Sequence, residues 1–178
     1  MPFKPIISLL CLTTLLSACC DNPEPPLQGC CDIPGIHGTV GNAHVYVPNI
    51  FTPNGDGHND YLFAYGDLFL VRLVSFQIRD KEGQVVFQAL DQIPNDPISG
   101  WDGTINGVLK EGLYNITIQA EASDGTIGTL EGKVCNYPCK EMIAGEPISA
   151  QGCQFPSQVT DGYFDPTIPT NEESDCFE

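Results

Sequence analysis

The chain has 178 residues, and its 23 acidic residues against 7 Lys and Arg produce a formal net charge of −16. Such acidity excludes nucleic acid and bare anionic lipid as partners, because both would be repelled. With 18 Gly and 15 Pro, the composition favours short strands and many turns over helices.

Residues 1–18 have the pattern of an export signal. One cation, Lys4, precedes an apolar run, Ile6 to Leu16, that is too short to cross a bilayer. The run ends on Leu16-Ser17-Ala18-Cys19, the lipobox pattern of bacterial lipoproteins. We therefore expect cleavage after residue 18 and lipidation of Cys19, so that buried acyl chains anchor an outer membrane lipoprotein, surface-exposed or periplasm-facing. The alternative is an ordinary cleaved signal that leaves Cys19 as a disulfide partner.

Residues 19–42 are rich in Pro and Gly, which predicts an extended tether behind the lipid. Beyond Cys19 seven cysteines remain, and in an exported chain they predict disulfide bonds rather than a zinc site. Seven is odd, and Cys20 beside the lipid is our candidate for the unpaired one. Fifteen pairings exist among the six candidate disulfide cysteines, which are Cys30, Cys31, Cys135, Cys139, Cys153 and Cys176.

Alternation of apolar and polar residues predicts half-buried strands in the middle of the chain. The clearest run, residues 113–122, would place Tyr114, Ile116, Ile118 and Ala120 inward, and Val74, Phe76 and Ile78 would share another inward face. Weaker strands are expected at 43–47, 61–65, 84–88 and 127–134. About seven short strands at this spacing predict an all-β sandwich over residues 43–134, with the most secure hairpin turning at Asp124-Gly125. Residues 135–178 lose this periodicity and predict an irregular, disulfide-clipped tail.

One segment carries a family resemblance: Val47-Pro48-Asn49-Ile50-Phe51-Thr52-Pro53-Asn54-Gly55-Asp56-Gly57-His58-Asn59-Asp60. Further matches follow in order, namely Phe76 to Arg79, Gly83-Gln84-Val85-Val86-Phe87, Gly100-Trp101-Asp102-Gly103-Thr104, Glu111-Gly112-Leu113-Tyr114 and Leu130-Glu131-Gly132-Lys133-Val134. Together they resemble the gliding motility-associated C-terminal domain family of the Bacteroidetes. The resemblance implies an immunoglobulin-like sandwich and, in many members, a sorting signal for type IX secretion.

The family's domain usually ends its protein, whereas this chain continues for about 44 residues after Val134. We therefore expect a membrane-anchored, non-catalytic envelope lipoprotein whose sandwich binds another envelope or surface protein, as an accessory of gliding, adhesion or secretion machinery. A type IX sorting domain is the first alternative. A carbohydrate-binding module is the second, and it would require Trp101, the lone tryptophan, to be exposed rather than in the core.

The acidic loop within the resemblance is the candidate ligand site. Its oxygen-bearing residues recur every second position, as in calcium-binding loops, and the candidate calcium ligands are Asn54, Asp56, His58 and Asp60. The alternative, which we favour, is that Asn54, Asp56 and Asn59 accept hydrogen bonds from nearby backbone amides and fix a turn. No catalytic motif is present, and the histidines at 37, 44 and 58 are scattered, so no enzyme is expected.

Overall fold

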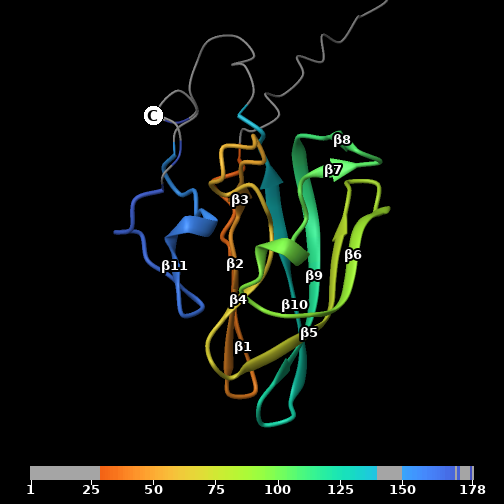
Figure 1. Ribbon diagram of the computed structural model, residues 1–178, viewed down its shortest axis with the longest axis vertical. Helices are drawn as coiled ribbons and strands as arrows, with labels where there is room; N and C mark the ends of the chain where they lie inside the picture. The colour runs from red at the N-terminus through yellow and green to blue at the C-terminus, as the bar shows by residue number, and fades with distance from the viewer. Residues whose placement is uncertain (1–28, 140–149, 171, 173–176, 178) are drawn as a thin grey trace, which may run out of the picture.

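The computed structural model describes residues 29–139, 150–170, 172 and 177, which form an all-β protein of packed sheets (Figure 1). Cys19 and the rest of the predicted signal and lipid site lie outside the described residues. Within the described part, no helix is long and apolar enough to cross a membrane. The elements are β1 (Ile36–Val40), β2 (Ala43–Val47), β3 (Ile50–Phe51), β4 (Tyr65–Gly66), β5 (Leu70–Arg79), β6 (Val85–Gln92), η1 (Pro97–Ser99), β7 (Thr104–Ile105), β8 (Val108–Leu109), β9 (Gly112–Ala122), β10 (Ile127–Asn136), η2 (Pro156–Gln158), β11 (Val159–Thr160) and β12 (Tyr163–Phe164).

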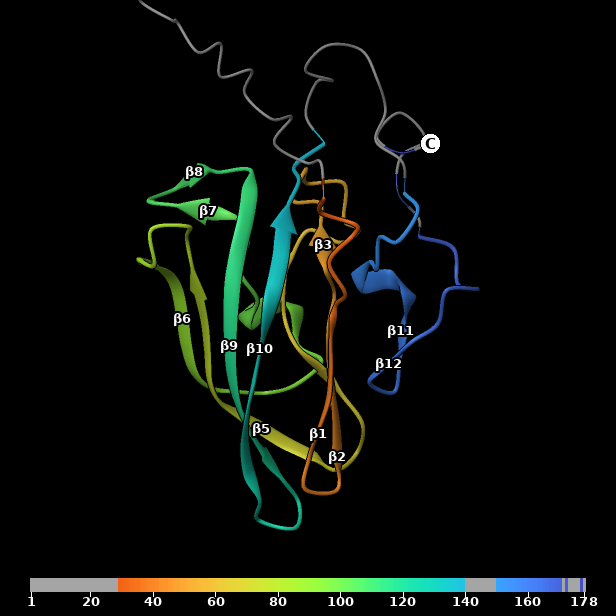
Figure 2. The same ribbon diagram turned by 180° about the vertical axis from the view of Figure 1, so that it is seen from behind.

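Two sheets form the body of the protein. A three-stranded sheet has the order β1-β2-β4, and a five-stranded sheet has the order β3-β10-β9-β5-β6. Strand neighbours are antiparallel except for β3, which runs parallel to the end of β10. Seen from behind, β9 and β10 run the length of the larger sheet, and β11 and β12 lie beyond β1 and β2 (Figure 2). The predicted all-β sandwich is confirmed.

The β9–β10 hairpin matches its prediction closely. All four residues predicted to face inward on β9 are buried, from Tyr114 at 5% exposed to Ala120 at 0%. Pairing with β10 runs without a register shift, and the Ala122 amide donates to the Thr126 carbonyl at 2.9 Å to close the turn. A strict period of two over eleven residues leaves only one face that can be buried, which is why this strand could be predicted.

β5 departs from the predicted alternation at Val74. Its register against β9 shifts between Leu73 and Ser75, so Val74 is half-buried while Leu73 is 1% exposed. Phe76 and Ile78 are buried as predicted. A bulge adds one residue to a strand and reverses the faces on one side of it, so a period of two cannot hold across it.

The sandwich begins earlier than the sequence indicated. Residues 36–40, which we assigned to the tether, form β1 and pair with β2 along their whole length. Ile36 and Val40 are buried, with Gly38 between them. A Cβ atom at Gly38 would lie 2.6 Å from Leu130 Cδ2, so glycine allows β1 to approach β10 across the core. Gly38 thus makes this packing feasible, but it also interrupts the apolar pattern of β1, so the strand is hard to recognise in the sequence.

The described part of the tail contains a few short elements within an otherwise irregular chain. Cys135 and Asn136 complete β10, and the following chain returns to form η2, β11 and β12. Phe155 at 0% exposed and Phe177 at 9% exposed join Ile50 and cysteine side chains in a second, smaller core. Phe164 also stacks on Tyr46 of β2, with ring centroids 6.0 Å apart. The tail therefore packs on the outer face of the three-stranded sheet.

Candidate functional site

The segment that carries the family resemblance starts inside the sandwich and ends on its surface. The Cys135 amide of β10 donates to the Asn49 carbonyl at 2.7 Å, which fixes β3 against the larger sheet. Asn49, Thr52 and Asn59 are buried, whereas the stretch 55–58 is exposed. The motif thus has a structural part that faces the protein and a short tip that faces solvent.

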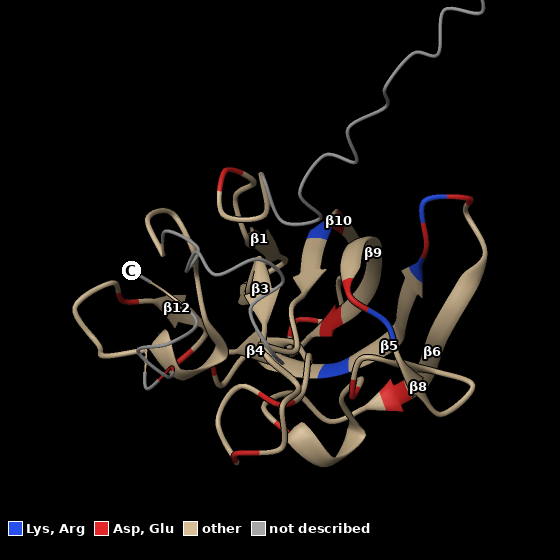
Figure 3. Cartoon of the chain, turned by 90° about the horizontal axis from the view of Figure 1, so that it is seen from above, with Lys and Arg blue, Asp and Glu red and all other residues tan. Residues whose placement is uncertain are grey.

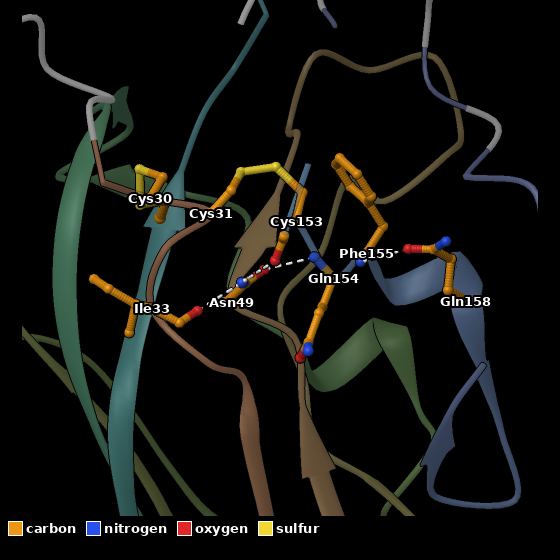
Figure 4. The surroundings of a disulfide bond; sticks show 10 residues. Cys30, Cys31, Ile33, Asn49, Cys153, Gln154, Phe155 and Gln158 are labelled. Atoms are coloured by element: carbon orange, nitrogen blue, oxygen red, sulfur yellow. Dashed lines mark hydrogen bonds between the residues drawn. A yellow bond between two sulfur atoms is a disulfide. The ribbon is translucent and has the colours of Figure 1, made fainter. Parts of the chain in front are cut away.

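Asn49 is the central hydrogen-bonding residue of the structural part (Figure 4). At 1% exposed, its Nδ2 donates to the Ile33 carbonyl at 2.7 Å and to the Gly152 carbonyl at 3.0 Å. Its Oδ1 accepts from the Gln154 amide at 2.7 Å. One side chain therefore joins the segment before β1 to the tail that follows β10. Nothing in the local spacing of Asn49 predicts these partners, because they lie 16 to 105 positions away.

Two disulfides reinforce the same junction. Cys30 is bonded to Cys135 and the adjacent Cys31 to Cys153, with Cα–Cα distances of 5.6 Å and 4.2 Å. One pair of neighbouring cysteines thus holds both the end of β10 and the start of the ordered tail. Cys139 is also disulfide-bonded, and Cys176 lies outside the described residues.

Asn59 and Thr52 hold the tail at a second point. Asn59 accepts from the Ser157 amide at 2.7 Å and donates to the Thr170 carbonyl at 3.2 Å. It also donates to the Glu172 carboxylate, which accepts from the Thr52 hydroxyl at 3.1 Å. We predicted that Asn59 would fix the local turn, and this was wrong, since it bridges to the tail instead. Its backbone has a φ of 50°, in the left-handed region that asparagine tolerates.

The exposed tip is fixed by side chains that cap backbone amides. Asn54 Oδ1 accepts from the Asp56 amide at 3.0 Å, and Asp56 Oδ1 accepts from the His58 amide at 2.7 Å. Asp60 accepts from the amides of Gly55 and Gly57 at 2.7 and 2.8 Å. Of the four candidate calcium ligands, three thus take part in the turn that the alternative predicted, and calcium binding stays a prediction. Among the described residues, no group of three or more His, Cys, Asp or Glu side chains could hold a metal.

A groove opens beside this tip, with a volume of about 370 Å³. The motif residues 57–60 and the aromatic residues of the following segment 61–65 line one part of it. The two 3-10 turns contribute Pro97 and Pro156. Burial raises the pKa of Tyr65, one of the lining residues, so its phenol stays protonated at neutral pH. The groove therefore adjoins the exposed tip of the motif.

Trp101 is a core residue. It is 2% exposed, its Nε1 donates to the Thr104 carbonyl at 3.0 Å, and its backbone exchanges hydrogen bonds with Leu62. Tyr114 meets the indole edge to face, with centroids 4.8 Å apart. The carbohydrate hypothesis required an exposed Trp101, so this residue no longer supports it.

Charge divides the described part of the chain into two sides (Figure 3). Every Lys and Arg that the structure describes lies on or beside β5, β8, β9 or β10: Arg72, Arg79, Lys81, Lys110 and Lys133. The described residues of β1, β2, the motif and the tail include acidic residues but no Lys or Arg. The motif and its groove therefore lie on the purely acidic side.

Comparison with known families finds a similarity that covers the sandwich. No curated protein matches the chain. Residues 45–130, just under half of the chain, match the CHU_C type IX secretion signal domain. The match begins in β2 and ends in β10, so it covers the body of the sandwich without β1 or the tail. Residues 45–130 are therefore similar to the CHU_C type IX secretion signal domain family, and the predicted resemblance to gliding motility-associated C-terminal domains is confirmed.

Proposed function

We propose that residues 45–130 act as an address for type IX secretion on a protein of the cell envelope or surface. The observation that carries the proposal is the family match, which extends over an ordered sandwich rather than over a short linear motif. Between an interaction module and a sorting domain, both of which the sequence allows, the match supports the sorting domain better. The lipid anchor at Cys19 stays a prediction beside it.

The structure restricts which part of the motif an apparatus could contact. Asn49, Thr52 and Asn59 are buried and bind the tail of the same chain. The exposed stretch 55–58 is held in shape by Asp56 and Asp60. A preorganised loop costs little further conformational entropy when it is recognised. We therefore assign recognition to this tip and scaffolding to the buried residues.

A fusion experiment tests the address. An exported fluorescent reporter is joined to residues 29–178. A shorter fusion from residue 43 would lack β1 and the two disulfide-bonded residues Cys30 and Cys31. The fusion is expressed in a type IX-competent host and in a strain that lacks the translocon. We expect the reporter outside the cells of the competent host only. Retention in both strains would refute the address function.

A matched pair of variants tests the role of the tip. Asp56 accepts from the His58 amide at 2.7 Å, and Asp124 accepts from the Thr126 amide at 2.8 Å in the β9–β10 turn. Asp56→Ala and Asp124→Ala therefore each remove a hydrogen bond to the amide two residues further along the chain. Both aspartates are exposed, so both variants should fold. We expect Asp56→Ala to lower export of the fusion and Asp124→Ala to leave it unchanged. Equal export of the two variants would contradict recognition through the tip.

A further inference from the structure

Three aromatic side chains form a row along one face of the segment that leaves the motif. Leu62 and Ala64 point into the core, at 0% and 1% exposed. Because side chains alternate along an extended chain, Tyr61, Phe63 and Tyr65 point the other way and line the groove. Tyr61 is 43% exposed, and the rings of Phe63 and Tyr65 lie 4.4 Å apart. Tyr61 thus presents ring surface to solvent rather than to the core.

The groove around this row has the dimensions of a small-ligand site. Its volume of about 370 Å³ lies in the range of natural ligand sites, and its lining is mostly apolar. Pro156 enters from the tail, and its position is fixed because the neighbouring Ser157 amide donates to Asn59 at 2.7 Å. The tail therefore supplies part of the groove lining, through Pro156 and Ser157.

One rim of the groove carries oriented hydrogen-bond acceptors. Asp60 lines the groove, and its two carboxylate oxygens are held by the amides of Gly55 and Gly57. Each carboxylate oxygen keeps a further lone pair for a ligand donor. Ser157 also lies on the rim and uses its hydroxyl hydrogen on the Thr170 carbonyl, so its oxygen can accept. The rim thus suits a ligand that brings several donors.

An aromatic floor with an acceptor-rich rim fits a pyranose sugar. Such a ring offers an apolar face of C–H groups to stack on an aromatic side chain, and its hydroxyls donate at the edge. A proline-rich peptide also fits aromatic grooves, but proline has no N–H to give to Asp60. Anionic sugars are disfavoured, because this side of the described structure includes acids and no Lys or Arg. The observations therefore favour a neutral saccharide.

We propose that the groove between the motif tip and the tail binds a neutral saccharide, stacked on Tyr61 and hydrogen-bonded to Asp60. The site is separate from Trp101, which is in the core. The groove shares Gly57 and His58 with the tip that we assign to recognition, but the two proposals can fail separately, because sugar binding by the purified protein requires no secretion apparatus. A family domain would thereby gain a ligand site from residues that follow it in the chain.

Titration of the purified full chain tests the site. The probes are cellotetraose, maltotetraose and chitotetraose, each up to about 10 mM, with tetragalacturonate as an anionic probe and decaproline as a peptide probe. Amide chemical shifts report binding. We expect at least one neutral probe to shift the amide signals of residues 57–61 and 157. Tetragalacturonate and decaproline should leave these signals unchanged. If none of the three neutral probes shifted these amide signals, or if decaproline shifted them instead, the proposal would be overturned.

Two tyrosine variants separate the groove from general surface effects. Tyr61→Ala removes the exposed ring of the row, whereas Tyr163→Ala removes a comparably exposed ring, at 51%, that lies against His44 and outside this groove. We expect roughly tenfold weaker saccharide binding for Tyr61→Ala and unchanged binding for Tyr163→Ala. The reverse order, or equal binding by both, would refute the assignment, and the chemical-shift dispersion of each variant shows whether it is folded.

Discussion

Replacement of Asn49 by alanine tests whether this residue joins the two ends of the sandwich. The substitution removes three hydrogen bonds of 2.7 to 3.0 Å from a side chain that is 1% exposed. Gly152 is exposed, so its carbonyl can bind water instead, whereas the Ile33 carbonyl and Gln154 amide lie in half-buried residues. At about 1 to 1.5 kcal/mol for each of these two groups left without a partner, we expect a loss of about 2–3 kcal/mol in the free energy of unfolding.

Urea unfolding with the disulfides intact measures this loss. Asn54→Ala is the matched control, because Asn54 lies in the same motif but makes only local, exposed hydrogen bonds to Asp56. We expect about 0.5 kcal/mol or less for the control. Native-state hydrogen exchange should show faster exchange of the Gln154 amide in Asn49→Ala. If the two variants were equally stable, Asn49 would not hold the junction.

The remaining predictions concern the cystines, acid stability, the lipid anchor and calcium. In the double variant with Cys31 and Cys153 replaced by alanine, Cys30–Cys135 still closes most of the chain, so the lost bond releases a loop of only about 20 residues. Unfolding should therefore be easier by about 3 kcal/mol, and a loss below about 1 kcal/mol in urea would count against a stabilising role of this disulfide. Burial opposes ionisation of Asp67, but hydrogen bonds from the His44 ring and from two backbone amides outweigh it and lower the pKa of Asp67. This contribution to stability is therefore present above about pH 4 and is lost as pH falls through the lowered pKa; Asp67→Asn should flatten that part of the pH profile, and an unchanged slope would refute it. Cys19→Ala should abolish incorporation of labelled palmitate, and persistent labelling would disprove the anchor. Calcium at millimolar concentration should leave the melting temperature unchanged, because the loop carboxylates already bind amides; a rise of several degrees would reveal a site.

Local patterns predicted those parts of the fold whose partners lie close in sequence. The alternation in residues 113–122 and the Asp124-Gly125 turn identified β9 and its hairpin, and both depend on neighbouring residues alone. The strand expected at 61–65 is reduced to Tyr65–Gly66 and a bridge from Leu62 to Trp101. The extended conformation nevertheless persists where ladder hydrogen bonds do not, so Tyr61, Phe63 and Tyr65 share one face and form a row that we did not predict.

The features that sequence could not predict depend on long-range contacts. The pairing of Cys31 with Cys153 spans 122 residues, and nothing local distinguishes it from the other pairings. Asn59 resembles a turn residue, yet its side chain accepts from the Ser157 amide and donates to the Thr170 carbonyl. Loss of periodicity from residue 135 onward correctly indicated an irregular, disulfide-clipped tail but not its packing, because the second core is assembled from aromatic and cysteine side chains without a repeat.

Trypsin treatment of intact cells tests the central claim most directly. Lys81 lies at the β5–β6 turn with its side chain 85% exposed, so a protein outside the cell should be cut there. If residues 45–130 are a type IX address, cleavage of the native protein at Lys81 should occur in competent cells and disappear in an isogenic strain that lacks the translocon. Equal cleavage in both strains, or protection in both while lysates of the same cells are cut, would contradict the account.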